Sequence, residues 1–206
     1  VKVFNSDGVA VPFEAAPDNV RNFFQTGVST NNNVSISHAD ENGDFRFSGT
    51  QLNRRGIVPN TDLNRNTLQT SMGKKLFNNR LEFRANAMYV GSSSDNVPNA
   101  GYDESSSVMY SFLWLPRNTP IDDLRDYWKP GQENVQQSYV EELWGNNPWL
   151  IVNENTNSFN AARLLGDINA TYHINDRTNI RLRSGQDMKN DIRQYRRATS
   201  TKKVLF

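Results

Sequence analysis

The sequence predicts an all-β chain built from antiparallel hairpins. Segments of about ten residues alternate apolar with polar side chains, which is the period-two pattern of a strand with one apolar face. Very short turns and long polar loops alternate between these segments. In water such a ribbon packs its apolar face on a core. In a bilayer the apolar face contacts lipid and the polar face lines a lumen.

Three hairpins carry this pattern. The alternation is clearest from Leu81 to Tyr89, where apolar side chains occupy every second position and Glu82, Arg84 and Asn86 lie between them. The hairpins cover residues 33–53, 66–90 and 162–187, with turns at 41–43, 77–79 and 175–176.

The polar faces of the hairpins carry charged side chains. On a half-exposed sheet in water these side chains are simply solvated, whereas in a wide barrel they face a hydrated or plugged lumen. The candidate lumen-facing residues are Arg46, Glu82, Arg84, Asp167, Arg181 and Arg183.

The short turns and the long loops alternate strictly along the chain. The predicted long loops are 54–65, 92–157 and the polar, basic segment from Met188 onward. Short turns therefore fall on one rim and long loops on the other. This asymmetry is typical of an outer-membrane barrel, which has short periplasmic turns and long extracellular loops.

Short helices are expected outside the hairpins. Residues 1–30 form a lead-in segment whose helix begins at Asp18 and ends near Gly27. The loop 92–157 contains three helical patterns. The first, 107–115, is compatible with a helix or a strand, and we interpret it as a helix with a serine cap. The others are a helix that starts at 119–122 and stops by Pro130, and a short helix over 137–144.

Composition excludes several classes of protein. The mean hydropathy is −0.73 and no apolar run reaches the length of about 18 residues that a transmembrane helix needs. The net charge of +1 gives no argument for nucleic-acid binding. The absence of cysteine rules out disulfides and thiolate-bound metals.

The sequence shows no catalytic motif and predicts no metal or cofactor. The acidic segment 40–44 resembles the start of a calcium loop, but Phe45 and Gln51 stand where glycine and glutamate are required. His38 and His173 lie on separate strands without metal-ligand spacing. We therefore expect that the protein is not an enzyme.

Two segments resemble a known family. Asp18–Gly27 matches the pattern DNV-x-x-FF-x-TG of SusC/RagA-type TonB-dependent outer-membrane transporters. Gly56–Asp62, with Arg65 and Thr67 beyond it, is similar to the family's GIVPN[ST]D-x-x-R-x-T segment. The resemblance is strongest from Val11 to Tyr89, weaker over 92–157, and returns at 162–187.

The resemblance implies a fold and a function. Such transporters are 22-stranded plugged barrels of the bacterial outer membrane that import oligosaccharides or peptides. A TonB complex supplies their energy, and a SusD-like surface lipoprotein closes the outer rim. The chain begins at Val1 and has too few strands to close a barrel, so we expect residues 31–206 to be a partial, internal section of a larger molecule.

The aromatic residues of the long loop have two interpretations. They contact a glycan, a peptide or the lipoprotein lid, or they form a satellite core that holds the loop in shape. The residues concerned are Trp114, Tyr127, Trp128, Trp144 and Trp149.

Two alternatives to a transporter remain open. One is a soluble extracellular carbohydrate-binding β domain that uses the loop aromatics. The other is a secreted glycosidase, which would need a carboxylate pair in one cleft.

Overall fold

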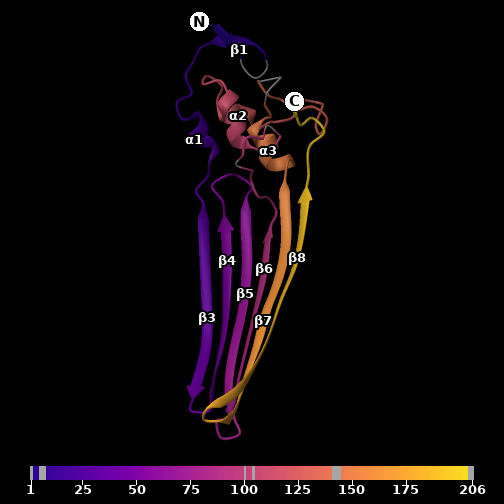
Figure 1. Cartoon of the computed structure of the whole chain (residues 1–206). Coiled ribbons are helices and arrows are strands. Elements are labelled where there is room, and N and C mark those ends of the chain that lie inside the picture. The colour runs from indigo at the N-terminus through magenta and orange to yellow at the C-terminus, as the bar shows by residue number, and fades with distance from the viewer. Residues whose placement is uncertain (1, 5–7, 100, 104, 141–144, 204–206) are drawn as a thin grey trace.

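The fold is dominated by one antiparallel sheet, shown in a computed structural model that describes residues 2–4, 8–99, 101–103, 105–140 and 145–203 (Figure 1). Its strands follow one another in sequence order, so each strand pairs with the next along the chain. This confirms the all-β prediction. The strands are β3 Val28–Asp40, β4 Gly43–Arg55, β5 Asp62–Leu76, β6 Leu81–Ser94, β7 Asn157–Asn175 and β8 Thr178–Tyr195.

The helices gather beyond one end of this sheet, where both ends of the chain also lie (Figure 1). A two-stranded sheet of β1 and β2 lies at the same end. The elements are β1 Lys2–Phe4, β2 Ala10–Pro12, α1 Asn19–Phe23, α2 Val108–Trp114, the 3₁₀ helix η1 Ile121–Leu124 and α3 Pro148–Glu154.

The strands are longer than the sequence predicts, and this corrects two of the predicted long loops. β4 and β5 pair as far as Arg55 and Asp62, so the connection between them is residues 56–61 rather than 54–65. β8 continues through Met188 to Tyr195, so the segment after Met188 is mainly strand. Backbone pairing with a neighbouring strand decides these ends, because apolar and polar side chains do not alternate regularly there.

The three hairpin turns lie together at the opposite end of the sheet from the helices (Figure 1). In the first turn Asp40 Oδ1 accepts hydrogen bonds from the backbone N–H groups of Asn42 and Gly43, at 2.8 and 2.9 Å. In the second turn Phe77, Asn78 and Asn79 all have positive φ.

Local hydrogen bonds and a close contact determine the residues of the connection 56–61. Gly56 N–H donates to the Thr61 carbonyl at 2.9 Å, and Thr61 Oγ1 donates to the Val58 carbonyl at 2.6 Å. A Cβ on Gly56 would lie 2.1 Å from Thr61 Oγ1, so glycine is required there. Asn60 has a φ of 56° and donates to the Val152 carbonyl of α3 at 2.8 Å.

The predicted helices are only partly correct. Ser107 caps α2 by accepting a hydrogen bond from Tyr110 N–H, as expected. Asp18 makes no side-chain cap on α1, and that helix ends at Phe23, before Gly27. The helix expected to run from Thr119 toward Pro130 is the single turn η1.

The last predicted helix of the loop is wrong over residues 137–140, which are not helical; residues 141–144 lie outside the described part of the chain. α3 is a helix that the sequence analysis missed. Its signals are an Asn147 side chain that accepts from Trp149 N–H and a proline at the first position.

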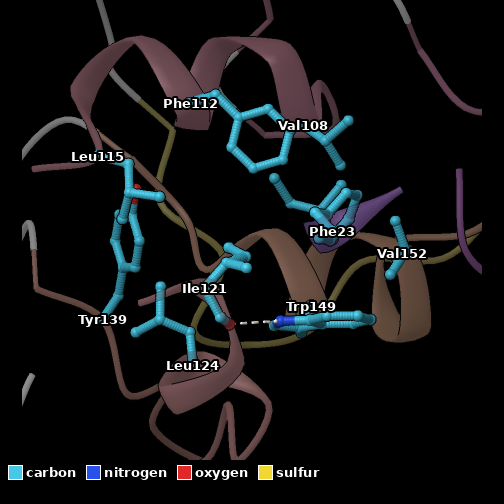
Figure 2. Packing of buried hydrophobic residues seen from close by; sticks show 10 residues of the cluster. Phe23, Val108, Phe112, Leu115, Ile121, Leu124, Tyr139, Trp149 and Val152 are labelled. Atoms are coloured by element: carbon cyan, nitrogen blue, oxygen red, sulfur yellow. Dashed lines mark hydrogen bonds between the residues drawn. The ribbon is translucent and has the colours of Figure 1, made fainter. Parts of the chain in front are cut away.

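The hydrophobic core lies among the helices rather than on the sheet (Figure 2). Phe23 of α1 is at its centre, with its ring 5.0 Å from Phe112 and 4.8 Å from Trp149. The core therefore joins α1 to the long connection between β6 and β7. Its other members include Val108, Leu115, Ile121, Leu124, Tyr139, Ile151 and Val152. We call α1, residues 95–156 and residues 196–203 together the loop domain.

The first hairpin depends on a close backbone approach at Gly43. A Cβ there would lie 2.4 Å from the Gly73 carbonyl oxygen. We predict that Gly43→Ala lowers the free energy of unfolding by about 2 kcal/mol, because the backbones of β4 and β5 must separate. Chemical unfolding followed by circular dichroism measures this change.

Gly49→Ala is the matched control for this substitution. Its Cβ would meet only Leu68 Cδ2, at 3.6 Å, which is an ordinary contact. An equal loss of stability in both variants would contradict the argument from backbone spacing.

Candidate functional site

The first candidate surface is the apolar face of the sheet. Cross-strand register places most of the large apolar side chains of the six strands on this face. They remain exposed, for example Val34 at 77%, Leu182 at 69% and Ile168 at 49%. Phe45, Phe83 and Ile168 all lie on this face of a single sheet, so they are not the inside of a closed sandwich.

The apolar side chains form a belt with defined edges. On β6 the belt runs from Leu81 to Tyr89, and on β7 from Leu164 to Tyr172. Eight residue steps at roughly 3.3 Å give the belt a length of about 26 Å, measured along the strand. The next row toward the helices is polar or small across the whole sheet: Asn32, Gln51, Asn66, Gly91, Ala162 and Asn190.

The second candidate surface is the opposite, polar face. Register places all six of the residues that the sequence analysis singled out on it: Arg46, Glu82, Arg84, Asp167, Arg181 and Arg183. Basic side chains outnumber acidic ones on this face. The structure therefore brings these residues to one surface.

One ion pair on the polar face crosses a whole strand. Arg84 on β6 reaches over β5 to Asp44 on β4, with Arg84 Nη2 2.8 Å from Asp44 Oδ1. Gly73 of β5 lies directly between them in the register. A Cβ on Gly73 would lie 2.6 Å from Asp44 Oδ1 and 2.8 Å from Arg84 Nη2. Glycine at this position makes the ion pair possible.

Further polar contacts tie neighbouring strands together on this face. Asp167 accepts hydrogen bonds from Asn86 across the strand pair at 3.1 Å and from Asn169 along its own strand at 2.8 Å. Arg163 and Asp187 form a two-pronged pair with distances of 2.8 and 2.5 Å. The sequence analysis missed Asp44, Arg163 and Asp187, although their positions in the period-two pattern place them with the other charges.

The polar face is hollowed at two places. One hollow of about 500 Å³ lies near the short turns and is lined by charged residues that include Asp44, Lys75 and Arg181. The other, of about 480 Å³, lies nearer the loop domain, beside Arg163 and Asp191. Both are open and charged, which suits solvated polar ligands or polar protein segments.

The aromatic residues of the long loop do not form one surface. Tyr127 and Trp128 are half-buried neighbours with ring centroids 5.5 Å apart. Trp114 is 45% exposed on α2, and Trp144 lies outside the described residues. Only Tyr127 and Trp128 are brought together among those described.

Trp149 is a core residue. Its side chain is 6% exposed, and its Nε1–H donates to the Ile121 carbonyl at 2.9 Å (Figure 2). The Arg125 guanidinium lies 4.1 Å from the centre of its ring. For Trp149 the structure therefore favours the satellite-core interpretation.

Tyr127 links the loop to the end of the sheet. Its hydroxyl donates to Glu154 Oε1 at 3.1 Å, and Arg196, just after β8, lies 3.3 Å from Glu154 Oε2. Burial, and then the neighbouring Glu154 carboxylate, raises the pKa of Tyr127. The tyrosine is therefore a neutral hydrogen-bond donor at physiological pH.

Among the described residues no group of three or more His, Cys, Asp or Glu side chains is placed to hold a metal ion. The helices in the described part of the chain are all too short or too polar to cross a bilayer. No protein-family model matches the chain, and no curated protein matches it in sequence.

Asp103 organises the start of the long loop. Its carboxylate accepts hydrogen bonds from Ser105 Oγ at 2.7 Å, from Ser105 N–H at 2.9 Å and from Asn99 Nδ2 at 3.0 Å, and it also binds Ser106 Oγ. Burial alone would raise the pKa of Asp103, but these hydrogen bonds outweigh it and lower the pKa below its ordinary value of 3.8.

This lowered pKa predicts an acid-sensitive loop domain. A carboxylate whose pKa is lower in the folded state contributes stability above its unfolded value, near 3.8, and loses it as the pH falls through the folded value. We expect Asp103→Asn to show a smaller loss of stability between pH 5 and strongly acidic pH than the parent chain, measured by tryptophan fluorescence during thermal unfolding.

Asp123→Asn, which removes an exposed carboxylate from the same loop, is the control. It should leave the acid-induced loss unchanged. If the two variants behave alike, the Asp103 hydrogen bonds are not the source of the pH dependence.

Proposed function

We propose that this chain is a section of a transmembrane β-barrel, and that the barrel belongs to a SusC/RagA-type transporter of the bacterial outer membrane. Its proposed function is the import of oligosaccharides or peptides, with no covalent bond made or broken in the imported molecule. The observation that carries the proposal is the exposed apolar belt on a single sheet. Large exposed apolar patches on proteins mark contact with a membrane or with another protein.

The length of the belt along each strand supports lipid as its partner. A transmembrane β-strand needs about 9–11 residues because it is tilted by about 45°, and the belt covers the nine residues Leu81–Tyr89 of β6. Tyr89 and Tyr172 lie in the two border rows of the belt. Aromatic side chains at both borders are typical of barrel girdles, because their polar ends reach the interface.

The polar face supports a filled or hydrated lumen. Its charged side chains are paired across strands, as with Arg84 and Asp44, or stand in open hollows. Charges of this density cannot face hydrocarbon without a cost of several kcal/mol each. With the belt toward lipid, this face is the inside of the barrel.

The free edges of the sheet support a larger molecule. β3 and β8, of 13 and 18 residues, form the two edges. Unpaired backbone groups along strands this long are unfavourable in water and more so in lipid. Further strands of the same barrel would satisfy both edges.

The rims set the orientation. The three short turns would lie in the periplasm and the loop domain outside the cell. From there the loop domain would contact the ligand or a SusD-like lipoprotein, while a TonB complex would act through parts of the transporter beyond this chain. These partners are proposed from the sequence resemblance.

Lipid exposure is testable by cysteine scanning, because the chain has no native cysteine. We predict that a fluorophore on Ile168→Cys is quenched by lipids carrying nitroxide labels, because Ile168 lies in the belt. A fluorophore on the neighbouring Asn169→Cys, on the polar face, is quenched instead by aqueous iodide. Scanning 164–172 in liposomes containing the assembled protein should reproduce this period of two.

The neighbouring position is the internal control, since both labels share one strand and one depth. Equal iodide quenching at Ile168 and Asn169, in a protein that stays monomeric without detergent, would favour a soluble β domain and overturn the barrel.

Transport itself requires a cellular measurement. We predict that bacteria lacking the gene for this chain lose uptake of at least one class of oligosaccharide or peptide, and that the intact gene restores it. Removal of the TonB complex should abolish uptake in the restored strain. Unchanged uptake of every oligosaccharide and peptide tested would remove the transport function while leaving the barrel assignment intact.

A further inference from the structure

The segment that follows β8 crosses the loop domain. Residues 198–202 lie against α3 and the polypeptide around Gln137, and Thr201 N–H donates to the Ala198 carbonyl at 3.0 Å, which closes a turn. The segment reads Ala-Thr-Ser-Thr-Lys and has no large apolar side chain. Hydrophobic burial therefore contributes little to holding it.

Three buried amide side chains bind this segment, mostly through its main chain. Asn146 pairs with the backbone of Lys202 in both directions, accepting from its N–H at 2.7 Å and donating to its carbonyl at 3.0 Å. Gln137 Nε2 donates to the Ser200 carbonyl at 2.6 Å. Asn155 Oδ1 accepts from Ala198 N–H at 2.9 Å.

Among the described residues, one hydrogen bond to these amides comes from a side chain of the segment. Thr201 Oγ1 donates to Asn155 Oδ1 at 2.8 Å. The three amides therefore bind the peptide backbone and one hydroxyl group of this segment.

The amides are held in place independently of the segment. Gln137 Oε1 accepts from Asn147 N–H at 2.9 Å, and Gln137 Nε2 also donates to Asn146 Oδ1 at 2.8 Å. Asn155 Nδ2 donates to the Ser105 carbonyl at 2.7 Å. Gln137, Asn146 and Asn155 are all buried. Their orientation is thus set by the loop domain, which is the condition for a preformed binding site.

Release of the segment would take the N–H of Ala198 and the hydroxyl of Thr201 away from Asn155 Oδ1, whereas Gln137 and Asn146 would keep their mutual hydrogen bond. The loss of hydrogen bonds from a buried amide oxygen is unfavourable, so water or another peptide main chain must take the place of the segment. The same geometry that retains the segment therefore favours any chain that offers an N–H and carbonyl pair at the same spacing.

We propose that Gln137, Asn146 and Asn155 form a binding site for a peptide main chain that forms a turn, and that residues 198–202 occupy it in cis as a releasable strap. A peptide with a Ser or Thr at the position of Thr201 competes for the site. The inference is independent of the transport proposal, since it concerns only contacts within the loop domain.

The test opens the strap in the full chain with Lys202→Pro. Proline has no N–H to donate to Asn146, so residues 198–203 should exchange amide hydrogens at least ten times faster than in the parent chain. Trypsin cleavage after Arg196, Arg197 and Lys203 should also accelerate in this variant. Hydrogen exchange read by mass spectrometry measures the first effect.

Thr199→Pro is the matched control. Thr199 is exposed and stands at the second position of the turn closed by Ala198 and Thr201, where proline is favoured. Its exchange and cleavage at the other sites should match those of the parent chain. Equal protection of the strap in the Lys202→Pro and Thr199→Pro variants overturns the proposal.

A labelled peptide with the sequence of residues 196–203 tests the site directly. By fluorescence anisotropy it should bind the Lys202→Pro chain at least ten times more tightly than the parent chain, whose site is occupied. The same peptide with proline in place of Lys202 should not bind, although it keeps most of the positive charge. Failure of the first peptide to bind an opened chain, or equal binding of both peptides, overturns the proposal.

Should Lys202→Pro not fold, Thr201→Val provides the second variant. It removes only the hydroxyl bond to Asn155 and should speed exchange of residues 198–203 by about threefold. No change in exchange in a folded Thr201→Val chain counts against the site.

Discussion

An uncovered apolar belt on one face of a single sheet is the constraint on which the interpretation of this structure depends. The large side chains of the belt, from Val34 on β3 to Met188 on β8, remain substantially exposed. The same chain buries Phe23, Trp149 and Leu150 almost completely in the loop domain. It therefore contains a buried hydrophobic core and, beside it, a large apolar surface that the described residues leave exposed. Each square ångström of apolar surface left in water costs about 25 cal/mol, so a belt of this size needs a partner.

The belt exists because of strand register. Side chains alternate faces with a period of two, so a slip of one residue in any pair would move that strand's apolar residues to the charged face. Glycines fix two of the close contacts that keep the register: Gly43 allows β4 to approach β5, and Gly73 leaves room for Arg84 to reach Asp44. Contacts on the polar face therefore help to keep the register that gathers the apolar side chains on the other face.

The loop domain is held by two kinds of contact. Aromatic packing around Phe23 joins α1 to α2 and α3. Buried amides then join distant segments through their backbones, as Asn19 does to the Thr119 carbonyl at 2.6 Å. Asn147 likewise donates to the Leu124 and Ser138 carbonyls at 2.9 and 2.8 Å. Amide side chains suit irregular loops, because they replace the backbone partners that a sheet or helix would supply.

The sequence by itself determined the three hairpins, the division of residues between their faces, and the Ser107 cap of α2. These features are local, since they follow from alternation and from side chains within a few residues of the backbone groups they bind. It also placed Arg46, Glu82 and Asp167 on the polar faces of their hairpins, because every second side chain of a strand points to the same face. Only the tertiary structure decided where β4 and β8 end, that Trp149 belongs to the core while Trp114 stays exposed, and that Asn146 meets Lys202. Those outcomes depend on contacts between residues dozens of positions apart, and no local pattern encodes which distant backbone a polar side chain will reach.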